Sequence, residues 1–231
     1  MPLDPTAAAE ITGFTWVPEF ARGFVRDTRA RWAFEEVGLP YRVRLIDFEE
    51  VKSEAHRNIQ PFGQVPTFAD GEVEMFESGA IAVRIAEQGS GLLPQDDAGR
   101  ARAIQWVIAA LNSVEPFVVQ LVVVDLFEAD KPWSAERRPS VVDTLRSRLH
   151  DLSNALGEND WLDGNFTVGD LIMVSVLRQL HDSGLLTEFP NLAAYVARGE
   201  GRPAYKRAMS DHLATFENAG ATPPPDQPKE Q

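Results

Sequence analysis

The stretch Phe62–Ile81, which reads FGQVPTFADGEVEMFESGAI, decides the fold of this chain. Asp70-Gly71 near its middle is a preferred two-residue turn, so the short runs on either side are predicted to pair as a β-hairpin. Pro66 has no N–H to donate to a strand ladder, which places it at the first residue of the first strand. A helical pattern, Ser78–Gln88, follows the hairpin and ends at a glycine. The stretch therefore predicts strand, strand and helix in close succession.

Upstream of this stretch, the chain alternates between strand and helix patterns. Residues 41–46 read YRVRLI, in which apolar and basic residues alternate as in a half-buried strand. The helix before them ends at Gly38, with Pro40 two residues later, which is a typical helix stop. The predicted order is βαβαββα in a domain of residues 10–89, with strands at 11–16, 41–46, 66–69 and 72–76 and helices at 24–37, 51–59 and 78–88.

Downstream of the stretch, the pattern is helical throughout. Residues 90–96 contain Gly-Ser-Gly and a proline and are predicted to be a linker to an all-helical domain of residues 97–218. Pro116 is predicted to kink or interrupt the first helix. Thr167-Val-Gly-Asp170 resembles a capping box with Asp in place of Glu. The helices of this domain are predicted at 98–127, 135–156, 168–183, 192–199 and 203–216.

The composition indicates a soluble globular protein. The 231 residues carry a formal net charge of −13, spread along the chain, which argues against nucleic acid or an anionic membrane as a partner. The most apolar run, Phe117–Phe127, is far shorter than the ~20 residues that a bilayer-spanning helix needs. No signal peptide is recognised at the start, so a cytoplasmic location is expected. Residues 1–9 and 219–231, rich in Pro, Ala and polar residues, are predicted to be disordered.

The chain contains no cysteine and four histidines. Without cysteine there can be no disulfide, no thiolate metal ligand and no Cys nucleophile. The histidines lie far apart in the sequence and show no metal-binding spacing. No metal site is therefore predicted, and no role is assigned to the histidines.

Four segments taken together point to a known family: Ala33–Tyr41 (AFEEVGLPY), Phe62–Thr67 (FGQVPT), Phe76–Ile81 (FESGAI) and Phe166–Asp170 (FTVGD). In this order they resemble the cytosolic glutathione S-transferases, and the resemblance covers residues 11–217. It implies an α/β + all-α protein, with an N-terminal thioredoxin-like βαβαββα domain followed by an all-helical C-terminal domain. It also implies glutathione as a cosubstrate, no bound cofactor, and assembly as a homodimer.

The resemblance assigns the parts of glutathione to residues of the quoted stretch. It implies a cis bond before Pro66, which would turn the backbone of Val65 outward to pair with the cysteinyl backbone like an added strand. Ser78, with its hydroxyl, its N–H and the helix dipole, would bind the γ-glutamyl carboxylate, while Glu77 would take the α-amine. Gln64 would lie near the glycyl end. The alternatives are a trans proline at a sheet edge and a serine that only caps its own helix.

The residue that should activate the thiol is missing from its usual place. A free thiol has a pKa of about 8.5, and most of the family lowers it with a Tyr, Ser or Cys near the start of the first helix. Here Phe24–Asp27 match those positions, and none of them can act in that way. Arg26 as a fixed cation and Thr28 as a hydroxyl donor are the remaining candidates. A solvated charge and a half-buried helix residue are the alternative interpretations.

The resemblance places the second substrate, a small hydrophobic electrophile, beside large side chains of the loop after the first strand and of the first long helix. The candidates are Trp16, Phe20, Trp106, Leu111, Asn112 and Phe117. Ordinary core packing explains each of them at least as well. The apolar content of residues 107–127 could equally cover a dimer contact.

Three functions remain open from the sequence. The first is a glutathione transferase, which moves the glutathione thiolate onto the electrophile. The second is a glutathione-dependent reductase acting in peroxide, disulfide or dehalogenation chemistry, although the lack of cysteine excludes variants that pass through a protein–glutathione mixed disulfide. The third is a non-catalytic binding or scaffold protein of the same fold, which the missing thiol-activating residue favours.

Overall fold

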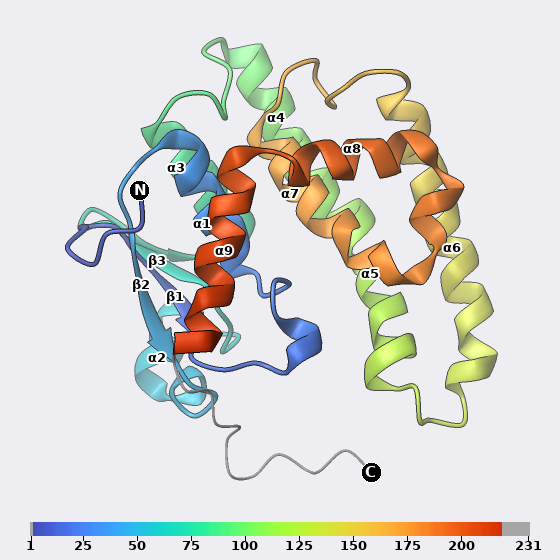
Figure 1. Ribbon diagram of the computed structural model, residues 1–231, viewed down its shortest axis with the longest axis horizontal. Helices are drawn as coiled ribbons and strands as arrows, with labels where there is room; N and C mark the ends of the chain where they lie inside the picture. The colour runs from blue at the N-terminus through green and yellow to red at the C-terminus, as the bar shows by residue number, and fades with distance from the viewer. Residues whose placement is uncertain (1, 219–231) are drawn as a thin grey trace. The chain divides into compact units, whose positions relative to one another are not determined.

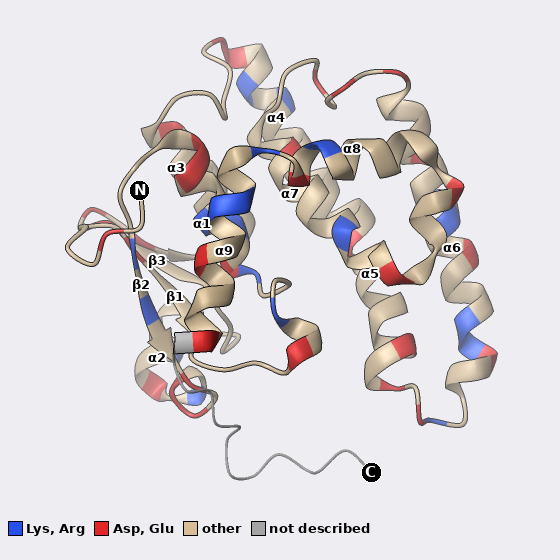
Figure 2. Cartoon of the chain, viewed as in Figure 1, with Lys and Arg blue, Asp and Glu red and all other residues tan. Residues whose placement is uncertain are grey.

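The computed structural model describes residues 2–218, so the tail predicted to be disordered lies outside the described residues. Contacts divide the described chain into two compact units, residues 2–90 together with 203–218, and Gly91–Arg202. Figure 1 shows a small sheet with helices in the first unit and a mostly helical second unit. Acidic and basic residues are scattered over the helices of both units (Figure 2). The predicted α/β part and the predicted helical part are both present.

The first unit is built on a four-stranded mixed sheet with the strand order β2-β1-β3-β4. β1 and β2 run parallel, and β3 pairs antiparallel with both β1 and β4. This gives the predicted order βαβαββα of a thioredoxin-like domain. The strands are β1 (Glu10–Phe14), β2 (Arg42–Ile46), β3 (Thr67–Ala69) and β4 (Glu74–Phe76), and the helices are α1 (Asp27–Val37), α2 (Glu54–Ile59) and α3 (Ser78–Gln88).

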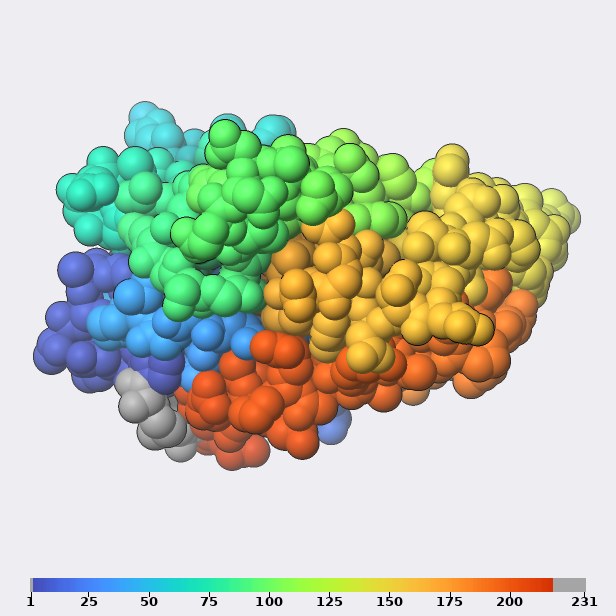
Figure 3. All heavy atoms as spheres, turned by 90° about the horizontal axis from the view of Figure 1, so that it is seen from above, coloured from blue at the N-terminus to red at the C-terminus, as the bar shows by residue number. Residues whose placement is uncertain are grey.

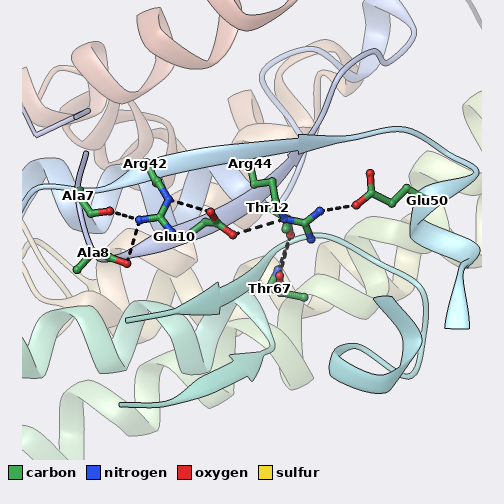
Figure 4. Close-up of polar contacts among 8 residues, drawn as sticks. All are labelled: Ala7, Ala8, Glu10, Thr12, Arg42, Arg44, Glu50 and Thr67. Atoms are coloured by element: carbon green, nitrogen blue, oxygen red, sulfur yellow. Dashed lines mark hydrogen bonds and ion pairs between the residues drawn. The ribbon is translucent and has the colours of Figure 1, made fainter. Parts of the chain in front are cut away.

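The segment predicted to be disordered at the start, residues 1–9, is ordered from residue 2 onward. Asp4 donates its N–H to the carbonyl oxygen of Tyr41 (2.8 Å), directly before β2. The guanidinium of Arg42 in β2 binds the carbonyl oxygen of Ala7 (Figure 4). The prediction was wrong because main-chain and side-chain partners on β2, which composition does not reveal, hold the segment against the sheet.

Helix α1 begins at Asp27 and not at Phe24, where the sequence pattern placed its start. Gly23 has a φ of 84°, a left-handed conformation that interrupts a right-handed helical path. Arg26 is then the N-cap of α1. The residues aligned with the usual thiol-activating position therefore lie in the turn that leads into the helix and at its first residue.

The last helix, α9 (Pro203–Asn218), belongs by its contacts to the first unit. It packs along α1, where the Arg207 Nε lies 2.6 Å from Glu35 Oε2. Figure 3 shows the atoms of α9 beside those of the N-terminal third of the chain. The helical unit thus ends at Arg202, whereas the sequence prediction extended the helical domain over residues 97–218, because the helical pattern of α9 does not indicate which helix it packs against.

The second unit contains α7 (Val168–Leu177), a helix that is almost entirely buried and carries the predicted capping box between Thr167 and Asp170. Its burial explains why its sequence is apolar on every face. The helices with which α7 packs are α4 (Asp97–Ala109), α5 (Glu115–Val122) and α8 (Pro190–Glu200), and α6 (Ser134–Leu156) packs in turn on α5 and α8.

The first long helix is interrupted before Pro116, as predicted. A π-helical turn, Ala110–Val114, joins α4 to α5, and the N–H of Glu115 donates to the carbonyl oxygen of Ala110. Pro116 follows in the first turn of α5, where a missing N–H costs little. The helical segment Asp97–Phe127 could cross a membrane by length and composition alone. Within the second unit α4 packs on α7, and 39% of the apolar window of this segment is buried.

Candidate functional site

The first part of the candidate site is the point where the ladder between β1 and β3 ends. Its last ladder pair is Ile11 with Phe68, and Pro66 has no N–H with which to extend the pairing. The N–H of Thr67 donates to the hydroxyl oxygen of Thr12 (2.7 Å), and the two threonine hydroxyls lie 3.1 Å apart (Figure 4). A buried side chain of β1 therefore anchors the start of β3.

Val65, immediately before this point, combines a buried side chain with an open backbone. The Val65–Pro66 bond is cis, as the family resemblance implied. The Val65 side chain belongs to a small apolar cluster with Ile46 and Val51. Within the described part of the chain, no hydrogen bond uses the N–H or C=O of Val65. Backbone groups left in this state can pair with an extended ligand as an added strand does.

His56 on α2 holds the residue before Val65. It is 3% exposed, and its Nε2 lies 2.8 Å from the carbonyl oxygen of Gln64. Because a carbonyl oxygen only accepts, the ring proton lies on Nε2, while Nδ1 is buried without a partner among the described residues. His56 thus fixes the backbone that leads into the open strand. The sequence analysis missed it because a histidine bound to a main-chain carbonyl has no characteristic spacing.

The second part of the site is the beginning of α3. Its N-cap, Glu77, has a φ of 74°, which is uncommon for a residue with a side chain, and it makes no side-chain cap. The first backbone hydrogen bond runs from the N–H of Ile81 to the carbonyl of Glu77 (2.9 Å), so the three N–H groups before Ile81 precede the helical ladder. Backbone conformations of this kind gather at functional sites.

Ser78 is the first residue of α3 and not its N-cap, so the alternative of a simple capping serine does not describe it. The side chain is 4% exposed, and its hydroxyl oxygen accepts a hydrogen bond from Nη1 of Arg29 on α1 (3.1 Å). Uncapped N–H groups, the positive end of the helix dipole and a nearby guanidinium all favour an anion. The start of α3 is therefore suited to a carboxylate, and the exposed Glu77 beside it is suited to an amine.

The third part is the beginning of α1, where a thiol-activating residue is expected. Arg26 is the N-cap, is exposed to solvent and makes no side-chain cap. Thr28 donates its hydroxyl proton to the carbonyl oxygen of Val25 (2.7 Å). A hydroxyl has one proton, so in this conformation Thr28 has none to give to a sulfur atom. Of the two predicted candidates, Arg26 fits the stabilisation of a thiolate better.

A buried charge cluster follows Arg26 and holds the start of α1. Asp27 Oδ2 lies 2.8 Å from Arg31 Nε and 3.3 Å from Nδ1 of His212 on α9, and all three side chains are buried. Burial by itself raises the pKa of Asp27, but Arg31 and His212 outweigh it, so this pKa lies below its usual value. Gly13 on β1 permits the close approach, since a Cβ there would lie 3.0 Å from Asp27 Oδ2.

Two of the predicted second-substrate residues lie in the first unit. Trp16 is half-buried and meets Phe48 edge to face, at 6.2 Å between ring centroids. Phe20 is 42% exposed, which is high for so large an apolar side chain. An exposed aromatic in the loop before α1 is available to a ligand, and its assignment to the second substrate stays a prediction.

The other four lie in the second unit. Trp106 packs so closely against α7 that a Cβ at Gly169 would come within 2.6 Å of the Trp106 Cβ, which favours the core-packing interpretation for Trp106. The Phe117 ring lies 4.9 Å from the guanidinium of Arg148. Leu111 is half-buried and Asn112 is exposed. Their assignment to the second substrate likewise stays a prediction.

Comparison with known proteins gives a consistent result. The family described as "Glutathione S-transferase, N-terminal domain" matches residues 21–87. Glutathione S-transferase F11 of Arabidopsis thaliana is 32% identical over 198 residues, which cover 78% of this chain and 91% of the relative. Glutathione S-transferase F12 of the same plant is 33% identical over 207 residues, which cover 78% and 91%. A solved glutathione transferase from Burkholderia graminis, with two glutathione molecules bound per subunit, has a TM-score of 0.77 at 25% identity and covers 87% of each chain.

Proposed function

The chain belongs to the glutathione S-transferase family, and we propose that it is a glutathione transferase whose glutathione site lies in the first unit. The observation that carries this proposal is the open backbone at Val65 together with the uncapped start of α3. The cysteinyl backbone of glutathione pairs with Val65, the γ-glutamyl carboxylate binds Ser78, and the α-amine binds Glu77. Gln64 then lies toward the glycyl end.

The start of α1 stabilises the thiolate in this proposal. A free thiol has a pKa of about 8.5, and a fixed cation at a helix N-terminus lowers it. Arg26 supplies that cation, while Thr28 supports the turn through its bond to Val25. The thiol proton leaves to solvent, and the thiolate attacks the electrophilic carbon of a small hydrophobic substrate. The carbon–sulfur bond forms as the leaving group departs with its electron pair.

Assembly as a homodimer and a cytoplasmic location belong to the same proposal. Exposed apolar side chains of the segment Asp97–Phe127 offer surface for a second copy: Ile108, Leu126 and Phe127. Light scattering on the purified protein measures the assembly against the chain mass of 25.6 kDa. A monomeric mass at micromolar concentration would contradict the dimer.

A thermal-shift titration combined with an aryl halide assay tests the transferase function. Glutathione at 100 times its Kd should stabilise the protein by about 2.7 kcal/mol, which raises the melting temperature by several degrees. 1-Chloro-2,4-dinitrobenzene should then be converted to its glutathione conjugate with release of chloride. An unchanged melting temperature at millimolar glutathione would overturn the binding site, and binding without turnover of any electrophile would favour the scaffold alternative.

A second candidate function is the reduction of a hydroperoxide by two glutathione molecules. The support is the Burkholderia graminis transferase, whose structure holds two glutathione molecules per subunit. Two thiols and one hydroperoxide would give glutathione disulfide, an alcohol and water, so electrons and atoms balance without a protein cysteine. Coupling to glutathione reductase and NADPH measures the disulfide formed. Hydroperoxide turnover faster than aryl halide turnover would favour this candidate over the transferase.

A further inference from the structure

Arg29 is a buried cation that reaches from one helix to the start of another. It is the third residue of α1, is 3% exposed, and donates from Nη1 to the hydroxyl oxygen of Ser78 in α3 (3.1 Å). Arginine is almost never buried to this extent unless its charge and its donors are used. The Arg29 guanidinium therefore links α1 to the start of α3 through the Ser78 hydroxyl.

The hydrogen bond determines what the Ser78 hydroxyl can do. A guanidinium only donates, so the Ser78 oxygen must accept, and its own proton must point elsewhere. Within the described residues, no acceptor for that proton is found. A buried O–H group without an acceptor is unfavourable, and a carboxylate oxygen would satisfy it with a charge-assisted hydrogen bond. The bond from Arg29 thus leaves the Ser78 hydroxyl to act as a hydrogen-bond donor toward a ligand.

The positive charge of Arg29 adds to the partial positive charge at the N-terminus of α3. The uncapped N–H groups at the start of α3 already carry a partial positive charge, and a guanidinium 3.1 Å from the Ser78 oxygen adds a full one. Because the group is removed from water, its field at this point is screened less than that of a surface arginine. Both effects attract an anion and repel an amine.

We propose that Arg29 is a positioning residue that selects the γ-glutamyl α-carboxylate of glutathione, by fixing the Ser78 hydroxyl as a donor and by supplying the positive charge behind it. The inference rests on the proposed glutathione site. It goes further in assigning the discrimination between a peptide that carries this carboxylate and one that lacks it to a residue of α1.

Isothermal titration with two ligands tests the assignment. The first is glutathione, and the second is γ-aminobutyryl-cysteinyl-glycine, in which hydrogen replaces the γ-glutamyl α-carboxylate. The wild-type protein should bind glutathione about tenfold to hundredfold more tightly than the analogue, the range of one charge-assisted hydrogen bond. In Arg29→Met this preference should fall below about threefold. Equal weakening of both ligands would show a purely structural role and overturn the proposal.

Four further variants make the result specific. Ser78→Ala should lose the same preference, and adding Arg29→Met to it should change the preference little further, since both act on one hydrogen bond. Arg44→Met removes a partly exposed arginine of β2, paired with Glu10 and Glu50, and should keep the wild-type preference. If Arg29→Met does not fold, Arg29→Lys keeps the charge and moves the donor. It should reduce the preference for glutathione over the analogue, and an unchanged preference would overturn the proposal.

The outcomes also separate this inference from the proposed function. If the wild-type protein binds neither peptide, the glutathione site itself is wrong. If it binds both peptides equally well, the glutathione site stands and the carboxylate assignment of Ser78 and Arg29 is wrong. A preference that persists in Arg29→Met but disappears in Ser78→Ala would leave Ser78 in place and remove Arg29.

Discussion

The helices α7 and α3 begin in opposite ways. At the start of α7, Asp170 accepts hydrogen bonds from the N–H groups of Thr167 and Leu162 (both 2.9 Å) and from the hydroxyl of Tyr195 (3.0 Å). The Thr167 hydroxyl completes a capping box. At the start of α3, the N-cap Glu77 makes no side-chain cap and holds a left-handed φ. One helix start satisfies its own polar groups, and the other leaves them open.

This difference separates a structural site from a binding site. A buried donor without a partner is costly, so a helix start left open is expected where a ligand supplies the acceptor. α7 needs no ligand, because its own side chains serve the N–H groups. The N-cap of α1, Arg26, also makes no side-chain cap, but the N–H groups of Thr28 and Arg29 donate to the carbonyl oxygens of Val25 and Arg26. The carboxylate and the thiolate of glutathione are assigned to the starts of α3 and α1, although the N-caps of α5, α6 and α8 also lack a side-chain cap.

The largest effect on stability is expected at the capped start of α7. Asp170→Ala removes the acceptor of two N–H groups and of the Tyr195 hydroxyl, which are left buried without it. The free energy of unfolding should fall by about 3 kcal/mol. Urea denaturation at neutral pH measures the loss. A loss below about 1 kcal/mol would contradict the view that the α7 cap stabilises the fold.

The next effect is expected at the open helix start, where affinity should change more than stability. Ser78→Ala should raise the Kd for glutathione about tenfold to hundredfold, because one charge-assisted hydrogen bond is lost. The free energy of unfolding should fall by only about 1 kcal/mol, since Ser78 caps no helix N–H and only Arg29 loses an acceptor.

A serine outside the site provides the control for this variant. Ser140 on α6 is exposed and bonds the carbonyl of Arg137, so Ser140→Ala should leave the Kd for glutathione unchanged. If Ser78→Ala destabilises the protein as much as Asp170→Ala while glutathione affinity stays the same, the contrast between the two helix starts fails.

The same contrast shows what the sequence can predict. The element order, the start of α3 and the capping box at Thr167 depend on residues a few positions apart, and all were predicted correctly. The hairpin at Asp70 was also predicted, but its two-residue turn was wrong, because Ala69 pairs with Glu74 and four residues join the strands. The partners that complete the site come from elsewhere in the chain. Thr12 and Thr67 are 55 positions apart and Arg29 and Ser78 are 49 apart, and such pairs arise only when helix and sheet pack together.

The ordered start of the chain and the placement of α9 were missed for a related reason. Residues 2–9 have the composition of a disordered segment, but Tyr41 and Arg42 offer them hydrogen-bond partners. α9 has a helical pattern like its neighbours in sequence, but its Arg207 pairs with Glu35 of α1. Composition and periodicity describe a segment by itself and carry no information on which surface it will meet.

The third effect concerns the open start of α1. Arg26→Gln should lower kcat/KM for an aryl halide about tenfold, with a larger loss at pH 6.5 than at pH 8.5, because losing a cation raises the pKa of the bound thiol. Thr28→Val is the matched comparison and should keep kcat/KM within about twofold, since its hydroxyl proton is bonded to Val25. If Thr28→Val loses the activity and Arg26→Gln keeps it, the two assignments must be exchanged.

The smallest effect is expected in the pH dependence of the free energy of unfolding, which should differ between the buried aspartates at the starts of α1 and α7. Asp27 is paired with Arg31 and His212, which outweigh its burial and hold its pKa below the usual value. Asp170 has only neutral partners, and burial raises its pKa. A lowered pKa contributes stability above the unfolded value of about 3.9 that is lost on acidification, and a raised pKa contributes stability at low pH that is lost as pH rises.

Asp27→Asn and Asp170→Asn should therefore differ in the sign of their pH dependence. Relative to wild type, the destabilisation by Asp27→Asn should stay constant as pH falls from 7 to about 4 and shrink only below that pH, where wild-type Asp27 becomes protonated and loses the ion pair. The destabilisation by Asp170→Asn should grow over the range from pH 7 to about 4, because wild-type Asp170 regains its favoured neutral form. Urea midpoints measured at intervals of about one pH unit report both trends. Parallel trends would mean that the cations beside Asp27 do not distinguish the two helix starts electrostatically.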